Sequence, residues 1–415
     1  MKTEKQILSN GVRIISERLT DVRTCSIGVY IANGSRHEPA YKAGISHCIE
    51  HMLFKGTETK TAADIAQILD RLGGHSNAYT TKERTCFYVT CLSSALTETA
   101  HLLADMILHP RMSDADLTME RGVIFEEIDM YEDTPEDLVF DLLSRNSFSS
   151  CPVGRPILGT RSALNRLNGE QLHAYMKTHY TGPNVIVALS GNFSDADLSS
   201  IEMLFSDIPN GTKNKSRPTV YNTSKTTRKK QIEQVHLCIC FPGLSDVDPD
   251  RFAMRILNTV FGDGMSSRLF QRVREKEGLC YSVGGFSSSV SDAGVYEIYT
   301  ATNNDQQTAA IRTIMEEVDL LCSNGITEDE LNRAREQLEA NLLISLEGTG
   351  ARSGLIAKTE LQFGEAPDID RILEAYHAVS RDDISRLAEK IFQKDRLSFA
   401  AVGNVLTMED YDRVL

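Results

Sequence analysis

The sequence lacks the features that mark membrane proteins, secreted disulfide-rich proteins and phosphate-binding proteins. No apolar run in its 415 residues approaches the roughly 20 residues that a membrane span needs, and the polar start Met1–Gln6 has no signal-peptide core. The nine cysteines form no CxxC pair, which is typical of reduced thiols. The glycine-rich stretch 261–267 contains no GKS or GKT and is expected to be a loop. We therefore expect a cytoplasmic protein without a membrane partner.

The composition is that of a globular chain with an acidic balance. A length of 415 residues and a hydrophobic content of 41% predict two or more domains. The net charge of −14 disfavours nucleic acid as a main partner and would favour basic peptides if the negative potential is focused into a substrate chamber. Residues 211–230 depart from this balance, with seven Lys or Arg and no acid. Their composition predicts a solvated linker, and a segment that binds nucleic acid or anionic membrane is the alternative.

Residues 47–51, His-Cys-Ile-Glu-His, form the motif with the most specific chemistry in the chain. Apolar residues recur around it at the spacing of one helix face: Ile45, Ile49, Met52 and Leu53. On a helix, His47 and His51 are one turn apart with Glu50 on the same side, so both imidazoles can bind one metal beside a carboxylate. HxxEH is the inverse of the HExxH motif, whose glutamate is a general base. Two histidines on a helix surface are the alternative.

A second segment, residues 120–131, offers the third protein ligand that a catalytic zinc normally takes. Helical periodicity places Glu120 and Glu127 on its apolar side and Glu126 nearly opposite. Burial of an ionised carboxylate is costly unless a cation pairs with it, so a metal explains an inward Glu127 better than packing does. The alternative is an acidic surface helix, and spacing alone does not join this segment to the pentad.

The HCIEH pentad, followed about 70 residues later by ERGVIFEEI, resembles the pitrilysin, insulin-degrading enzyme and mitochondrial processing peptidase family. The chain looks like a short bacterial member, and the resemblance covers essentially all of it. The resemblance implies that His47, His51 and Glu127 bind one Zn²⁺ per chain. It also implies that Glu50 is the general base and that Glu120 lies behind the metal.

Four patterns of the first half recur in the second half at offsets of about 209 to 214 residues. Strand-like CSIGVYI from Cys25 matches VHLCICF from Val235, and CFYVTC from Cys86 matches VYEIYT from Val295. Helical SDADLTMERGVIFEE from Ser113 matches TEDELNRAREQLEAN from Thr327, and ALSGN ending at Asn192 matches AAVGN ending at Asn404. This self-similarity indicates a duplicated unit of roughly 200 residues.

The strand and helix patterns predict an α+β fold of two homologous repeats, each a mainly antiparallel sheet covered by helices on one face. We assign residues 1–210 to a zinc-bearing repeat, 211–230 to a linker and 231–415 to a metal-free repeat. The alignment sets Asn341 opposite Glu127, and the second repeat contains no HxxEH. The metal is therefore expected in the first repeat alone.

The resemblance also implies substrate-binding residues in both repeats. Arg274 and Tyr281 match a pair that the family uses near the zinc, where Arg274 would polarise the scissile carbonyl and Tyr281 would hydrogen-bond the oxyanion. Without the resemblance, the charge-rich surroundings favour Arg274 as a surface ion-pair partner. In the first repeat, the resemblance places Asn77 and Ala78 on an edge strand that pairs with the substrate backbone.

Together these features predict a zinc metalloendopeptidase that cleaves extended, unstructured peptides. Glu50 would deprotonate the attacking water and then protonate the leaving amine. The resemblance implies a chamber between two chains, and we expect a homodimer because this chain carries both the pentad and the Arg274–Tyr281 pair. The alternatives are a non-catalytic core or assembly subunit, and a catalytic half that needs a different, metal-free partner chain. Two histidines and a glutamate also suit manganese or cobalt.

Overall fold

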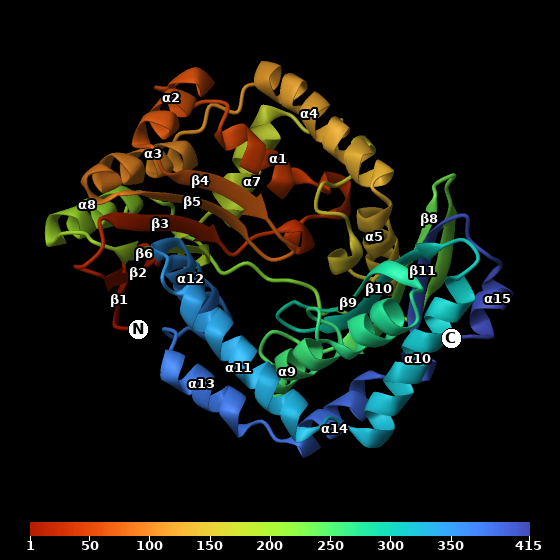
Figure 1. The fold of residues 1–415 in the computed structure, drawn as a ribbon. Coiled ribbons are helices and arrows are strands. Elements are labelled where there is room, and N and C mark those ends of the chain that lie inside the picture. The colour runs from red at the N-terminus through yellow and green to blue at the C-terminus, as the bar shows by residue number, and fades with distance from the viewer. The chain divides into compact units, whose positions relative to one another are not determined.

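Two β-sheets organise the chain, one in each half (Figure 1). The computed structural model describes residues 1–415. The six strands of the first sheet are β1 (Thr3–Ile7), β2 (Arg13–Arg18), β3 (Thr24–Ile31), β4 (His75–Thr80), β5 (Thr85–Leu92) and β6 (Val185–Gly191). The five strands of the second are β7 (Lys225–Lys229), β8 (Gln234–Gly243), β9 (Cys280–Ser289), β10 (Gly294–Asn303) and β11 (Ser398–Gly403).

The five strands of the second sheet correspond in order to five strands of the first, which has β1 as an additional edge strand. The strand orders of the two sheets are β1-β2-β6-β3-β5-β4 and β7-β11-β8-β10-β9. In each sheet one pair is parallel, β2 with β6 and β7 with β11, and the remaining pairs are antiparallel. The repeated sequence patterns lie on corresponding strands. In the first sheet β3 is central and pairs with β5, and in the second sheet β8 is central and pairs with β10. The predicted α+β fold of two homologous, mainly antiparallel repeats is confirmed.

The helices belong to two compact units, whose segments interleave along the chain. Unit 1 comprises Met1–Ile128, Arg155–Arg217 and Leu343–Asp368, and unit 2 comprises Asp129–Gly154, Pro218–Leu342 and Ile369–Leu415. Unit 1 holds α1 (Ile45–Leu53), α2 (Ala62–Leu72), α3 (Leu96–Leu108), α6 (Arg161–Leu164), α7 (Gly169–His179), α8 (Asp195–Phe205) and α12 (Thr349–Phe363). Unit 2 holds α5 (Pro135–Ser147), α9 (Arg251–Phe261), a π-helix at Phe270–Lys276, α10 (Gln307–Asn324), α13 (Ile369–Ala378), α14 (Arg381–Ile391) and α15 (Met408–Asp412).

Two long helices, α4 (Asp114–Asp133) and α11 (Glu328–Ser345), each begin in one unit and end in the other. They carry the matched sequences from Ser113 and Thr327 that were predicted to be helical. None of the helices combines the length and the apolar character needed to cross a membrane.

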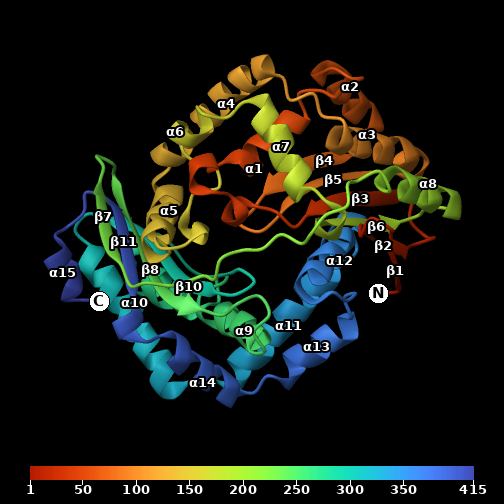
Figure 2. The ribbon, with the colours of Figure 1, turned by 180° about the vertical axis from the view of Figure 1, so that it is seen from behind.

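The helices of the first half of the chain cover one face of the unit 1 sheet, as predicted, and a helix from the other half of the chain covers the second face as well. Most helices pack on the face of Ile14, whereas Ile15, the next residue of β2, packs against Ile356 of α12. Both views show α12 beside β3 and β6 (Figures 1 and 2). The hydroxyls of Ser26 and Thr349 lie 2.8 Å apart at this contact. A strand buried on both faces thus explains why Ile14 and Ile15 are adjacent and both apolar.

The sheet of unit 2 receives a helix in the reciprocal way. Leu138, Val139 and Leu143 of α5, from the first half of the sequence, are buried against β8, β10 and β11. The ring of Phe140 lies 5.5 Å from that of Tyr299 on β10. Each compact unit therefore includes a helix that the sequence repeats assign to the other half. The boundaries at 1–210, 211–230 and 231–415 describe the sequence repeats and stay a prediction.

The basic segment 211–230 contains a strand as well as connecting residues. Lys225–Lys229 forms β7, which pairs in parallel with β11. Main-chain hydrogen bonds make this pairing possible whatever the side chains are, and the side chains of β7 alternate between exposed and half-buried positions. Arg228 makes an ion pair of 2.7 Å with Glu132.

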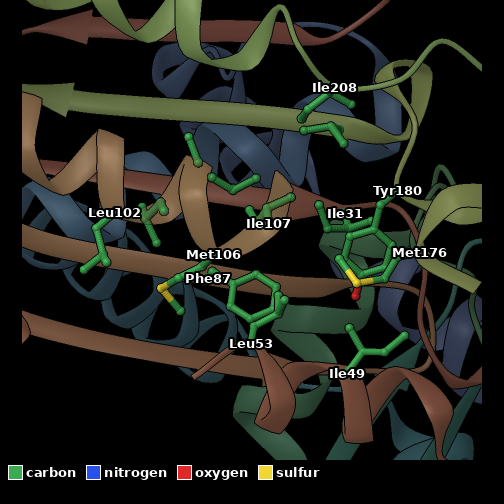
Figure 3. Close-up of a cluster of buried hydrophobic side chains, with 14 of the residues drawn as sticks. Ile31, Ile49, Leu53, Phe87, Leu102, Met106, Ile107, Met176, Tyr180 and Ile208 are labelled. Carbon is green, nitrogen blue, oxygen red and sulfur yellow. The ribbon is translucent and has the colours of Figure 1, made fainter. Parts of the chain in front are cut away.

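The core of unit 1 fixes α1, the helix of the pentad. Ile49 and Leu53 of α1 are fully buried. Figure 3 shows them in one cluster with Ile31 of β3, Phe87 of β5 and Met106 of α3. The predicted helical stripe is confirmed. Because this face of α1 is held by the core, the side chains of the other face have fixed positions.

Candidate metal centre

Two histidines of α1 lie close together at its surface. The Nε2 atoms of His47 and His51 are 3.2 Å apart, and their ring centroids are 4.4 Å apart. Both side chains are mostly buried, with exposed fractions of 12% and 16%. One helical turn separates them, so the helix backbone itself brings the two rings together.

Glu127 of α4 completes a cluster of three possible ligands. Its Oε2 lies 3.7 Å from Nε2 of His47, and its Oε1 lies 3.6 Å from Nε2 of His51. Ligand atoms that bind one zinc at about 2.0–2.2 Å in a tetrahedron are roughly 3.3–3.6 Å from one another. The three side chains are the one group of histidine, cysteine or acidic residues found with ligand atoms this close, within 4.8 Å of one another. Their spacing fits a single metal ion.

The state of these side chains also suits a cation. Oε2 of Glu127 is buried and has no hydrogen-bond partner, which is costly for a carboxylate oxygen unless a cation pairs with it. Burial, and after it the neighbouring His51, lowers the pKa of His47 to about 3. His47 is therefore neutral at physiological pH, and a neutral imidazole has the nitrogen lone pair that binds a metal.

Glu120 of α4 contacts His51 of α1 on the side away from Glu127. Its Oε1 is 2.8 Å from Nδ1 of His51, and its Oε2 is 2.5 Å from Nζ of Lys55. A carboxylate accepts a hydrogen bond, so Nδ1 carries the proton and Nε2 presents its lone pair towards His47 and Glu127. The Lys55 ammonium offsets the charge of Glu120, which is only 5% exposed.

Glu50 is the fourth chemically active side chain of this region. It lies one residue before His51 and is buried, with an exposed fraction of 9%. The hydroxyl of Thr80, the last residue of β4, donates a hydrogen bond to Oε2 of Glu50. Burial raises the pKa of Glu50, and the Thr80 hydrogen bond partly opposes this shift. A carboxylate with a raised pKa is suited to accept and return a proton.

The N-terminus of α1 is capped from a distance. Glu38 is buried, and its carboxylate accepts hydrogen bonds from the backbone N–H groups of Gly44, at 2.7 Å, and Ser46, at 2.8 Å. Burial raises the pKa of Glu38 to about 7, and above that pH its negative charge also complements the positive end of the helix dipole. Sequence patterns do not predict the roles of Glu38, Lys55 and Thr80, because each acts through a contact that helical periodicity does not reveal.

The predicted substrate residues of unit 1 lie on β4. This strand is at the edge of the sheet and pairs only with β5. Asn77 is exposed, and its side chain accepts a hydrogen bond from the backbone N–H of Ala78. An edge strand can pair with an extended peptide, so the position agrees with the predicted role, which stays a prediction.

The other predicted pair, Arg274 and Tyr281, lies in unit 2. Arg274 is on the π-helix, and its guanidinium carbon is 4.9 Å from the ring centroid of Tyr281 on β9 and 4.6 Å from that of Phe270. Nε of Arg274 is also 3.8 Å from a carboxylate oxygen of Glu275, the contact expected of a surface ion pair. Tyr281 is 77% exposed, so its hydroxyl is accessible. The role of this pair towards substrate stays a prediction.

Comparison with known proteins identifies the family. Residues 13–161 match the model described as insulinase, peptidase family M16, and residues 166–338 match the model described as the M16 inactive domain. An uncharacterized zinc protease of Bacillus subtilis, YmxG, is 41% identical over 93% of this chain and 95% of its own length. The chain belongs to peptidase family M16. The predicted family is therefore confirmed. Another uncharacterized zinc protease, from Streptomyces coelicolor, is 34% identical over 95% of the M16 chain and 88% of its own length.

A solved structure has the same fold across the whole M16 chain. A peptidase M16 inactive domain from Pseudomonas fluorescens superposes with a TM-score of 0.92, with 19% identity over 98% of this chain and 99% of that one. All three side chains of the cluster lie within residues 13–161, the match to the insulinase model.

Proposed function

We propose that this M16 chain is a zinc-dependent endopeptidase. The observation that carries the proposal is the cluster of His47, His51 and Glu127, whose ligand atoms have the separations that one tetrahedral ion requires. The curated relatives are named zinc proteases, which supports zinc as the metal. We propose one ion per chain, since the chain contains one such cluster.

The residues of the cluster and its neighbours have separate roles in the proposed peptide hydrolysis. Zinc held by the three side chains would supply a Lewis acid that polarises water and the scissile carbonyl. Glu50 takes a proton from the attacking water and passes it to the leaving amine, for which its buried, hydrogen-bonded carboxylate is suited. Glu120 holds the proton on Nδ1 of His51, so that Nε2 of His51 stays available to the metal.

The substrates we propose are extended, unstructured peptides. The exposed edge of β4 offers main-chain hydrogen bonds that depend little on the side chains of the peptide. Asn77 and Ala78 would lie beside the bound peptide backbone. We also propose that Arg274 and Tyr281 bind the substrate carbonyl and the oxyanion that develops from it, in a homodimer in which one chain provides the zinc cluster and its partner provides this pair. We also propose a cytoplasmic location for the enzyme.

The proposal is tested by zinc content and peptide cleavage measured on the wild type, Glu50→Gln and His51→Ala. The expected result is about one zinc in the wild type and in Glu50→Gln, with cleavage by the wild type alone. Wild type that binds no zinc, or Glu50→Gln that keeps most of the activity, contradicts the proposal. Wild type that binds zinc but cleaves nothing favours the alternative of a catalytic half with a different partner chain, and co-purification from the native source then tests that alternative.

The homodimer has its own measurement. Specific activity is followed across protein concentrations that span the monomer–dimer equilibrium, which sedimentation determines independently. Activity is expected to rise with the fraction of dimer. A monomer with full activity contradicts the shared site.

A further inference from the structure

The hydrogen bond between Thr80 and Glu50 joins the edge strand to the pentad. Thr80 is the last residue of β4, the strand that also carries Asn77 and Ala78. Side chains alternate along a strand, so Ala78 and Thr80 lie on the same face of the sheet. Ala78 packs against the core that holds α1, which places Thr80 on the side of Glu50.

The proton of the Thr80 hydroxyl is directed to Glu50 by its surroundings. The strand partner of Thr80 is Thr85, whose hydroxyl donates to the backbone carbonyl of Asn33 at 3.0 Å. The two threonine hydroxyls are 3.5 Å apart, at the limit of a hydrogen bond. Each hydroxyl has a single proton, and Thr85 gives its proton to Asn33. A carboxylate oxygen only accepts hydrogen bonds, so the hydroxyl of Thr80 is the donor that fixes one oxygen, Oε2, of Glu50.

The other oxygen of Glu50 makes no hydrogen bond within the chain. The hydroxyl of Thr80 is the one side-chain donor found on this carboxylate. A carboxylate held at one oxygen keeps a fixed plane and still has its second oxygen for a reactant. Correct orientation of a reacting group can contribute a large part of a rate enhancement, because misplacement by about 1 Å costs on the order of a hundredfold.

We propose that Thr80 is a positioning residue that sets the orientation of Glu50 and couples it to the strand on which the peptide binds. This inference rests on the proposed peptidase function. Peptide pairing beside Asn77 and Ala78 would hold the end of β4, and Thr80 would transmit that position to the carboxylate of Glu50. Thr80 therefore acts on turnover and has little effect on peptide affinity or on zinc binding.

The test compares Thr80→Val, which removes the hydroxyl at nearly constant shape, with Thr80→Ser, which keeps it. We expect Thr80→Val to lose at least tenfold in kcat with KM within about twofold of the wild type, and Thr80→Ser to stay within about threefold in kcat. Zinc per chain is expected to be unchanged in both variants. Wild-type kcat in Thr80→Val, or an equal loss in Thr80→Ser, overturns the proposal.

A matched control lies at the next position. Thr81 donates its hydroxyl to the backbone carbonyl of Arg84 at 3.2 Å and does not contact Glu50. Thr81→Val makes the same chemical change and is expected to keep wild-type kcat. If Thr80→Val does not fold, Thr80→Ala removes the same hydroxyl without the second methyl and is expected to show the same loss of kcat at unchanged zinc content.

Glu50→Gln, measured beside these variants, separates the two proposals. High activity in Glu50→Gln removes the proposed role of Glu50. An inactive Glu50→Gln together with a fully active Thr80→Val leaves the peptidase function intact and removes only the role of Thr80. Fluorescence anisotropy of a labelled peptide, measured with Glu50→Gln and with the double variant, is expected to give equal affinities. An affinity loss in the double variant comparable to the loss of kcat would assign Thr80 to peptide binding instead.

Discussion

The imidazole Nδ1 of His51 lies 2.8 Å from a carboxylate oxygen of Glu120, seven residues before Glu127 on the same helix. One face of α4 thus provides both the candidate ligand Glu127 and the carboxylate that orients His51. Lys55, 2.5 Å from the second oxygen of Glu120, keeps that carboxylate paired in a buried position.

Glu120→Gln is expected to weaken zinc binding by about 10- to 100-fold, because a neutral amide is a weaker partner for Nδ1 of His51. Competition with a chromophoric chelator measures the affinity. Glu126→Gln is the matched control, since Glu126 is exposed on the same helix and is expected to leave the affinity unchanged. Equal affinities of the wild type and Glu120→Gln would show that His51 needs no orienting partner.

Removal of the metal is expected to lower the Tm of the wild type by several degrees. Zinc that binds only the folded chain stabilises it by about 4 kcal/mol when its free concentration is a thousand times its Kd. Thermal unfolding with and without EDTA, followed by added zinc, measures the effect. The Tm of His51→Ala is expected not to respond to EDTA, and a response as large as that of the wild type would place the metal elsewhere.

Glu297 of β10 predicts a pH dependence of stability in unit 2. Burial, only partly opposed by the hydroxyl of Ser288 at 3.3 Å, raises the pKa of Glu297 from 4.5 to about 7. The folded state therefore holds this proton more tightly than the unfolded state does. The stabilisation is complete below pH 4.5 and is lost as the pH rises to about 7.

Glu297→Gln is neutral at every pH and removes this dependence. Relative to the wild type, we expect the variant to gain up to about 3 kcal/mol in the free energy of unfolding between pH 5 and pH 8. Urea unfolding at both pH values measures the change. Circular dichroism is used to follow it, because the chain has no tryptophan for fluorescence. A difference between the two proteins that is the same at both pH values contradicts the prediction.

Helix α5 of the first half of the chain packs on the sheet of unit 2, and α12 of the second half packs on the sheet of unit 1. This arrangement predicts that the two halves stay together after the segment that joins them is cut. A protease site inserted after Arg217, which is exposed, would separate the α5 fragment from the α12 fragment. Each fragment then retains a helix that is packed in the core of the other unit. We expect the cut protein to elute from a sizing column at the position of the intact protein. Fragments that separate without denaturant contradict this prediction.

The sequence by itself determined the local framework of the fold and of the site. Helical periodicity around residues 47–51 predicted α1, and the pattern from Ser113 predicted α4 with Glu120 and Glu127 on one face. Period-two patterns and their recurrence predicted two homologous sheets. These features follow from short-range geometry, since the spacing of side chains on a helix or strand is set by its own backbone.

Only the tertiary structure decided which of these elements meet. It brings α4 to α1, so that Glu127 lies within 3.7 Å of both histidines, and it brings Thr80 of β4 to Glu50. It also packs α5 and α12 on the sheets of the opposite repeats and adds β7 inside a segment whose composition predicted a linker. These outcomes depend on the burial of apolar faces and on main-chain pairing between residues far apart in the sequence. The local spacing of residues predicts neither of these long-range contacts.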